Sequence, residues 1–234
     1  MRALTTTRIG GVSGPPYSTL NLGLGGADDP ATVAANRRRL RAALGLTAEP
    51  GWLRQVHGAR VVELSAEAEP GEPPEADAAW TDRPGVACAI LTADCLPVVL
   101  ADEQGKGVAA AHAGWRGLAA GVLEATVGAL PVPAGRCRAW LGPAIGPRAF
   151  EVGPEVREKL LDADPGAGAA FARGTGDRWL ADLYALARRR LRAAGVQRIG
   201  GGVQCTFSEP NRFFSHRRDG GATGRMATLV WLRH

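Results

Sequence analysis

Residues 88–117 read CAILTADCLPVVLADEQGKGVAAAHAGWRG and contain three apolar runs separated by short polar segments. Apolar runs of about four to eight residues bounded by turn residues are typical of buried strands. Asp94 and Cys95 lie between the first two runs, and His112 ends the third run shortly before Gly114. Side chains at strand ends are held on rigid backbone and face a cleft. This stretch therefore predicts a metal site or a nucleophile at the edge of a sheet.

The end of this stretch is expected to begin a helix at Gly114, and the helix continues over residues 118–130. The N-terminus of that helix would lie beside His112, where free N–H groups and the helix dipole favour anions. Arg116 in the first turn has the unfavourable charge for the dipole, which indicates a role toward a ligand. The alternative is an arginine that simply extends into solvent.

Toward the N-terminus, residues 8–26 are rich in glycine and include Ser13 and Asn21. They lack the lysine of a phosphate-binding Walker loop, so an ordinary surface loop is favoured. Asp29 and Pro30 then predict the start of a helix over residues 31–44, which Gly45 would end.

Residues 52–64 alternate like strands on both sides of Gly58 and predict a hairpin, with Gln55 and His57 on one face. Further along, a helix is expected over residues 180–194, a short strand over 203–207 and a closing strand over 226–232. The glycine-rich loop before that last strand carries four arginines, which indicates either an anion site or a solvated loop. These four are Arg212, Arg217, Arg218 and Arg225.

The composition and charge of the chain limit the classes of protein to which it can belong. The chain has 234 residues, is 45% hydrophobic and has a net charge of +5, which suits small anions without indicating nucleic acid. Its four cysteines are widely spaced, with no apolar leader and no run of 18 apolar residues. We expect one cytoplasmic domain over residues 1–234, with reduced thiols and no membrane contact, as a monomer or homodimer. Irregular alternation of helices and strands predicts an α+β fold with mixed sheets in stacked layers.

His57, Cys95 and His112 together suggest a catalytic metal site. Two imidazoles and a thiolate suit zinc, and three protein ligands leave the fourth position of a tetrahedral site open. Cys95 and His112 alone could equally serve as a nucleophile and its base, without any metal.

Several segments identify a family resemblance that runs nearly end to end, above all TADCLP at 92–97 and HAGWRG at 112–117. The chain resembles the laccase-domain family, also named multicopper polyphenol oxidase-like. The resemblance implies a layered α–β sandwich and a zinc-dependent purine nucleoside phosphorylase, with adenosine deaminase and methylthioadenosine phosphorylase activity. It also places His57, Cys95 and His112 on the zinc-ligand positions. The chain departs from the family at Arg148 and Ala149, where cysteines are frequent.

The implied reaction needs groups that hold phosphate and the nucleoside. Arg116 and one of Arg217 or Arg218 are expected to bind phosphate, because arginine favours bidentate contacts with such anions. Ser13, Asn21 and Gln55 are expected to hydrogen-bond the sugar or the base.

Deamination suits the same metal, because zinc activates water for attack on the purine C6. Asp94 is the candidate proton shuttle for that step. Its alternative role is a structural hydrogen bond at a strand end.

Three other functions are weighed against this one. Copper-dependent phenol oxidation is disfavoured because four histidines are too few for several copper centres. A metal-free hydrolase or amidase using Cys95 and His112 would differ from the zinc enzyme in its metal content. A non-enzymatic metal-binding module fits poorly with the dense arginines around His112 and Phe214.

Overall fold

The organising stretch folds as three strands, β4 (Ala87–Thr92), β5 (Leu96–Asp102) and β6 (Val108–Ala113), as its apolar runs predict. They belong to a computed structural model of the chain, which describes residues 1–65 and 71–233. Every residue of β5 and β6 is buried, so both faces of these strands are covered. This two-sided burial explains why their sequences are continuously apolar instead of alternating.

Strands β5 and β6 form the middle of a mixed six-stranded sheet in the order β11-β7-β5-β6-β3-β2. The pairs around β5 and β6 are antiparallel, whereas the outer pairs β11–β7 and β2–β3 are parallel. The remaining strands of this sheet are β2 (Val61–Glu63), β3 (Ala78–Thr81), β7 (Cys137–Leu141) and β11 (Arg198–Gly201).

A second sheet, antiparallel and three-stranded, consists of β1 (Arg2–Thr5), β12 (Met226–Trp231) and β4. Ile90 of β4 packs between the two sheets in one cluster with Val99 of β5 and Val108 of β6. Ala89, the preceding residue of β4, faces the opposite side and joins a separate cluster with Leu40. The strand period of two therefore assigns each residue of β4 to one of two apolar layers.

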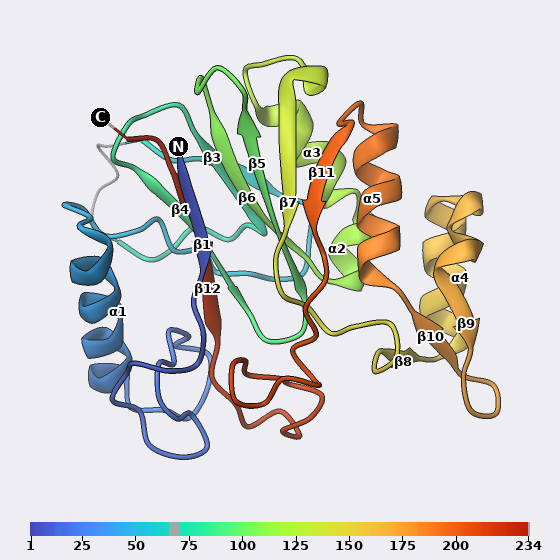
Figure 1. Cartoon of the computed structure of the whole chain (residues 1–234), viewed down its shortest axis with the longest axis horizontal. Helices are drawn as coiled ribbons and strands as arrows, with labels where there is room; N and C mark the ends of the chain where they lie inside the picture. The colour runs from blue at the N-terminus through green and yellow to red at the C-terminus, as the bar shows by residue number, and fades with distance from the viewer. Residues whose placement is uncertain (66–70, 234) are drawn as a thin grey trace.

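Helices cover the outer faces of both sheets (Figure 1). Helix α1 (Pro30–Leu44) packs on the three-stranded sheet through Leu40, and its ends match the capping signals, with Asp29 as N-cap and Gly45 as C-cap. Helices α2 (Trp115–Ala120), α3 (Val122–Ala129) and α5 (Leu183–Ala193) cover the six-stranded sheet. The result is a sandwich of helix, sheet, sheet and helix layers, which confirms the expected α+β class with mixed sheets.

A small subassembly extends from the helical side in Figure 1. It contains α4 (Pro154–Ala163), one short 3-10 helix and a three-stranded antiparallel sheet in the order β8-β10-β9. Its other elements are β8 (Glu151–Val152), β9 (Phe171–Arg173), β10 (Trp179–Ala181) and the 3-10 helix η2 (Pro165–Ala170), while η1 (Ala134–Arg136) precedes β7.

Three sequence predictions are wrong in detail. The helix expected over 118–130 is two helices, because Gly121 between them has a left-handed φ of 86°. The segments flanking Gly58 do not form a hairpin, since β2 pairs in parallel with β3 and Arg54 bridges to Glu75. The strand expected over 203–207 is reduced to a single bridge between Ala144 and Cys205.

Within the described residues, no helix is long and apolar enough to cross a membrane.

Candidate metal and substrate site

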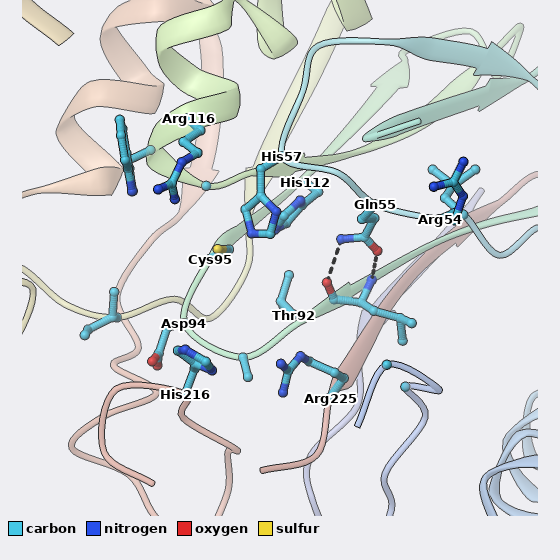
Figure 2. Close-up of a pocket in the computed structure, with 18 of the residues that line it drawn as sticks. Arg54, Gln55, His57, Thr92, Asp94, Cys95, His112, Arg116, His216 and Arg225 are labelled. Carbon is cyan, nitrogen blue, oxygen red and sulfur yellow. Dashed lines mark hydrogen bonds between the residues drawn. The ribbon is translucent and has the colours of Figure 1, made fainter. Parts of the chain in front are cut away.

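His57, Cys95 and His112 converge at one end of the central strands of the six-stranded sheet. Cys95 immediately precedes β5, and His112 lies near the end of β6, where it is paired in register with Pro97. Their ligand atoms and those of His57 all lie within 4.8 Å of one another. The two imidazole rings meet edge to face, with centroids 4.8 Å apart. Figure 2 shows both rings and the sulfur on the same side of the pocket.

The turn that carries His57 has an unusual backbone. His57 has a φ of 63°, in the left-handed region that non-glycine residues seldom adopt. The carboxylate of Asp77 accepts hydrogen bonds from three successive backbone N–H groups of this turn, those of Val56, His57 and Gly58, at 2.7–3.1 Å. Asp77 is the main site residue that sequence reasoning missed.

Glycine at position 114 leaves room for the ligands. A Cβ atom there would lie 2.9 Å from the sulfur of Cys95 and 3.5 Å from Cδ2 of His57. Three residues later, in the first turn of α2, Gly117 brings the helix against the carbonyl oxygens of Gly58 and His112, each 3.2 Å from where its Cβ would be. The HAGWRG motif therefore supplies one ligand and two close approaches of the backbone.

Electrostatics favour the thiolate form of Cys95 and the protonated form of His112. Burial raises the pKa of Cys95, but the nearby His112 and His57 outweigh it, and the net pKa lies below that of an ordinary thiol. Burial lowers the pKa of His112, yet the Cys95 thiolate and the hydrogen bond to Asp77 raise it on balance. These pKa directions pair the thiolate of Cys95 with a protonated His112, whose ring proton a metal ion would replace.

The three side chains fit a zinc ion by their chemistry. Nδ1 of His112 lies 2.8 Å from the Asp77 carboxylate, so Nε2 is the nitrogen left for a metal. A neutral imidazole with one nitrogen fixed in this way, a second imidazole and a thiolate form a typical three-ligand zinc set. The donor set and the space at Gly114 together meet the requirements for a metal site.

A cavity of about 720 Å³ opens in front of the three ligands. This volume lies in the range of small-molecule binding sites. Its walls include the aromatic side chains of Trp52, Trp115 and Phe150, and its cationic lining consists of Arg37, Arg54, Arg116, Arg217 and Arg225. The described lining therefore combines flat apolar surfaces with an excess of positive charge.

The arginines of the cavity differ in how they are held. Arg116 is exposed and its guanidinium lies 4.3 Å from the ring of Trp115. Arg217 donates to the backbone oxygen of Glu151 at 2.8 Å. Arg225, one of the four arginines of the possible anion site, points into the cavity in Figure 2 and donates to backbone carbonyl oxygens at 2.8 and 3.1 Å. Burial lowers its pKa.

The residues expected to bind sugar or base are placed differently. Ser13 and Asn21 both contact Asp28, at 2.7 and 2.9 Å, and are not part of the cavity lining. Gln55 lines the cavity, but its amide oxygen and nitrogen both bond the backbone of Leu91, at 2.8 and 2.9 Å. The polar atoms of these side chains hold the loops around the site together.

Asp94 lines the cavity and has a φ of 89°. Its carboxylate accepts from the hydroxyl of Thr206 at 2.6 Å, the hydroxyl of Ser215 at 3.0 Å and the backbone N–H of Arg217 at 2.7 Å. These contacts anchor the 205–225 loop beside the three candidate metal ligands. The proton-shuttle role of Asp94 stays a prediction. His216 also lines the cavity, whereas His234 is outside the described residues.

Comparison with known proteins gives consistent matches over the whole chain. The family described as multi-copper polyphenol oxidoreductase laccase matches residues 2–233. The purine nucleoside phosphorylase YfiH of Escherichia coli is 54% identical over 230 residues, which cover 98% of this chain and 93% of that protein. The purine nucleoside phosphorylase PA4543 of Pseudomonas aeruginosa is 55% identical over 234 residues, covering 100% and 94%.

Solved structures agree with the fold. The crystal structure of Neisseria meningitidis protein NMB0706 superposes with a TM-score of 0.94 at 50% identity, covering 99% of this chain and 94% of that one. YlmD from Geobacillus stearothermophilus also gives a TM-score of 0.94, at 33% identity, with 99% and 92% covered.

Proposed function

The chain belongs to the family described as multi-copper polyphenol oxidoreductase laccase, and on this premise we propose that it is a zinc-dependent purine nucleoside phosphorylase. Relatives more than half identical to it over nearly their full length carry the name purine nucleoside phosphorylase. The observation that carries the proposal is the convergence of His57, Cys95 and His112 on a cavity lined by arginines and aromatic rings. Adenosine, inosine and methylthioadenosine are the proposed substrates.

The cavity supplies what phosphorolysis requires. A phosphate oxygen attacks the anomeric carbon, the bond from that carbon to the purine nitrogen breaks, and the departing purine takes up a proton. Arg116, Arg217 and Arg225 would hold the phosphate, since arginine binds such anions through two parallel hydrogen bonds. Trp115 and Phe150 offer flat surfaces for the purine. The positive lining also stabilises the negative charge that phosphate brings to the reacting atoms.

His57, Cys95 and His112 would hold the zinc ion. When bound, zinc supplies a Lewis acid that polarises an oxygen atom placed at its open position. The protein fixes the ligands through Asp77 and keeps room at Gly114. Adenosine deamination is proposed as a second activity of this site, with Asp94 as the candidate proton shuttle.

The proposal is tested by incubating metal-quantified protein with adenosine, with and without phosphate, and separating the products by chromatography. Phosphorolysis predicts adenine and ribose 1-phosphate only when phosphate is present. Deamination predicts inosine in both conditions. Cys95→Ala should abolish the phosphate-dependent product. A preparation loaded with zinc that forms neither product would refute both activities.

A metal-free hydrolase is a second candidate, because the lowered pKa of Cys95 and the raised pKa of His112 suit a thiolate nucleophile and its partner. Alkylation separates the two proposals. A zinc enzyme should lose activity to a thiol reagent only after the metal is removed, whereas a cysteine hydrolase should lose it in either state.

Copper oxidation, suggested by the family's description, has less support. Only one group of three metal-ligating side chains lies close together in the described part of the chain. Multicopper chemistry needs several such centres.

A further inference from the structure

Asp77 is the residue that links two of the three ligands. It immediately precedes β3 and is fully buried, with 0% of its surface exposed. It does not line the cavity, so a substrate bound there would not reach it. Asp77 nevertheless contacts His57 through the turn and His112 through the ring.

The contacts to the His57 turn use both carboxylate oxygens. Oδ1 accepts from the N–H of His57 at 2.9 Å, and Oδ2 accepts from the N–H groups of Val56 and Gly58 at 3.1 and 2.7 Å. The left-handed backbone conformation of His57 has an energetic cost, because His57 is not a glycine. The three N–H groups that donate to one carboxylate offset this cost. The direction of the His57 side chain therefore depends on Asp77.

The contacts to His112 involve both the backbone and the ring. The N–H of His112 donates to the carbonyl oxygen of Asp77 at 2.7 Å, and Nδ1 lies 2.8 Å from Oδ1. The Asp77 carboxylate can accept a hydrogen bond from Nδ1–H of His112, which leaves Nε2 for the metal.

We propose that Asp77 is a positioning residue that sets both histidine ligands in place before the metal binds. This inference rests on the metal site of the proposed function. One carboxylate fixes the turn that carries His57 and the tautomer of His112, so its loss affects two ligands at once. In Asp77→Asn, the amide has an NH₂ group that cannot accept. If that NH₂ group replaces Oδ2, the N–H groups of Val56 and Gly58 lose their acceptor. If it replaces Oδ1, the N–H of His57 loses its acceptor and Nδ1 of His112 faces a donor, which shifts the ring proton to Nε2.

The test measures zinc affinity by competition with a chelator on purified Asp77→Asn protein and on a matched control, Asp102→Asn. Asp102 is also a buried carboxylate on the same sheet, but it lies at the far end of β5 and binds Arg136 and the N–H groups of Gln104 and Lys106. We expect Asp77→Asn to bind zinc about 10- to 100-fold more weakly than the wild type. Asp102→Asn should bind like the wild type although its stability falls. Wild-type affinity in a folded Asp77→Asn protein would overturn the inference.

A second measurement needs no variant. In the zinc-loaded wild type, nitrogen NMR should show His112 protonated at Nδ1 and bound to the metal through Nε2. Coordination through Nδ1 would overturn the inference even if Asp77→Asn fails to fold.

These outcomes separate the inference from the proposed function. A wild type that binds no zinc overturns both. Zinc binding with the predicted loss in Asp77→Asn, but without nucleoside turnover, supports the role of Asp77 and refutes the phosphorylase.

Discussion

Two residues with left-handed backbone mark the site at the level of single residues. Within the described chain, His57 and Asp94 are the non-glycine residues with positive φ, at 63° and 89°. The first is a metal-ligand candidate, and the second immediately precedes another. Each turn is held by a carboxylate, that of Asp77 or of Asp94 itself. Backbone conformations of this kind persist where surrounding contacts enforce them, and they cluster at functional sites.

The close approach at Gly114 gives a direct prediction. In Gly114→Ala the new methyl group would lie 2.9 Å from the Cys95 sulfur, which must move, while the backbone φ of −66° tolerates alanine. We expect zinc affinity to fall by roughly tenfold or more, as for other disturbances of a metal site. Gly128→Ala in α3 is the control, because its Cβ meets no atom within 4 Å. It should keep wild-type affinity and gain about 0.5–1 kcal/mol of stability. Unchanged zinc affinity in Gly114→Ala would contradict this account of the motif.

Asp94 yields a prediction that discriminates between its two roles. Asp94→Asn removes part of the support for the 205–225 loop, at a cost of about 1–3 kcal/mol in the free energy of unfolding. Because this carboxylate holds the loop that carries Arg217, a structural role predicts that phosphorolysis and deamination fall together while zinc is retained. Product chromatography with adenosine measures both activities in one sample. A loss confined to deamination would instead support the proton shuttle.

The residues missed by sequence reasoning have a common cause. The ligand candidates were predictable, because histidine and cysteine at strand ends suggest metal chemistry by their type alone. Asp77 contacts His112 across 35 positions, and Gln55 pairs with Leu91 across 36. Nothing near these residues in the sequence indicates such partners.

Among the secondary-structure elements, burial decides which predictions succeed. Strands β4, β5 and β6 were predictable because short continuous apolar runs between turn residues are typical of buried strands. Helix α1 was predictable from its caps at Asp29 and Gly45. The hairpin at Gly58 failed because the flanking segments bond distant partners, Arg54 with Glu75 and Val61 with Ala78. An alternating pattern shows which face is buried without identifying the neighbouring strand.

The turn between β5 and β6 gives a pH-dependent prediction. Burial raises the pKa of Asp102, but Arg136 and the N–H groups of the turn lower it below its ordinary value overall. A lowered pKa in the folded state means that the carboxylate stabilises the protein above its unfolded pKa, and that this stabilisation is lost as the pH falls through the folded pKa. Asp102→Asn should therefore cost about 1–3 kcal/mol at neutral pH.

Denaturant unfolding of both proteins between neutral and acidic pH measures this effect. The difference between wild type and Asp102→Asn should be constant near neutrality and shrink below about pH 4. A difference that grows on acidification would contradict the assignment.

At the scale of the whole molecule, the layers explain where the site lies. Helices cover the outer faces of the two packed sheets. Segments that are distant in the sequence therefore meet at the ends of the strands. The β4–β5 turn, the end of β6 and the 205–225 loop all reach the cavity there. The layered class could be predicted from the sequence, because its helix and strand signals alternate irregularly. The position of each loop could not, because it depends on contacts between distant segments.

The central claim is that His57, Cys95 and His112 hold a zinc ion on which nucleoside phosphorolysis depends. The most direct test is to strip the metal, add zinc stepwise and measure phosphate-dependent adenine release from adenosine at each step. The account predicts that activity rises with zinc and saturates at one equivalent per chain, and that Cys95→Ala gains none. Full activity in the metal-free protein, or activity restored only by copper together with phenol oxidation, would contradict it.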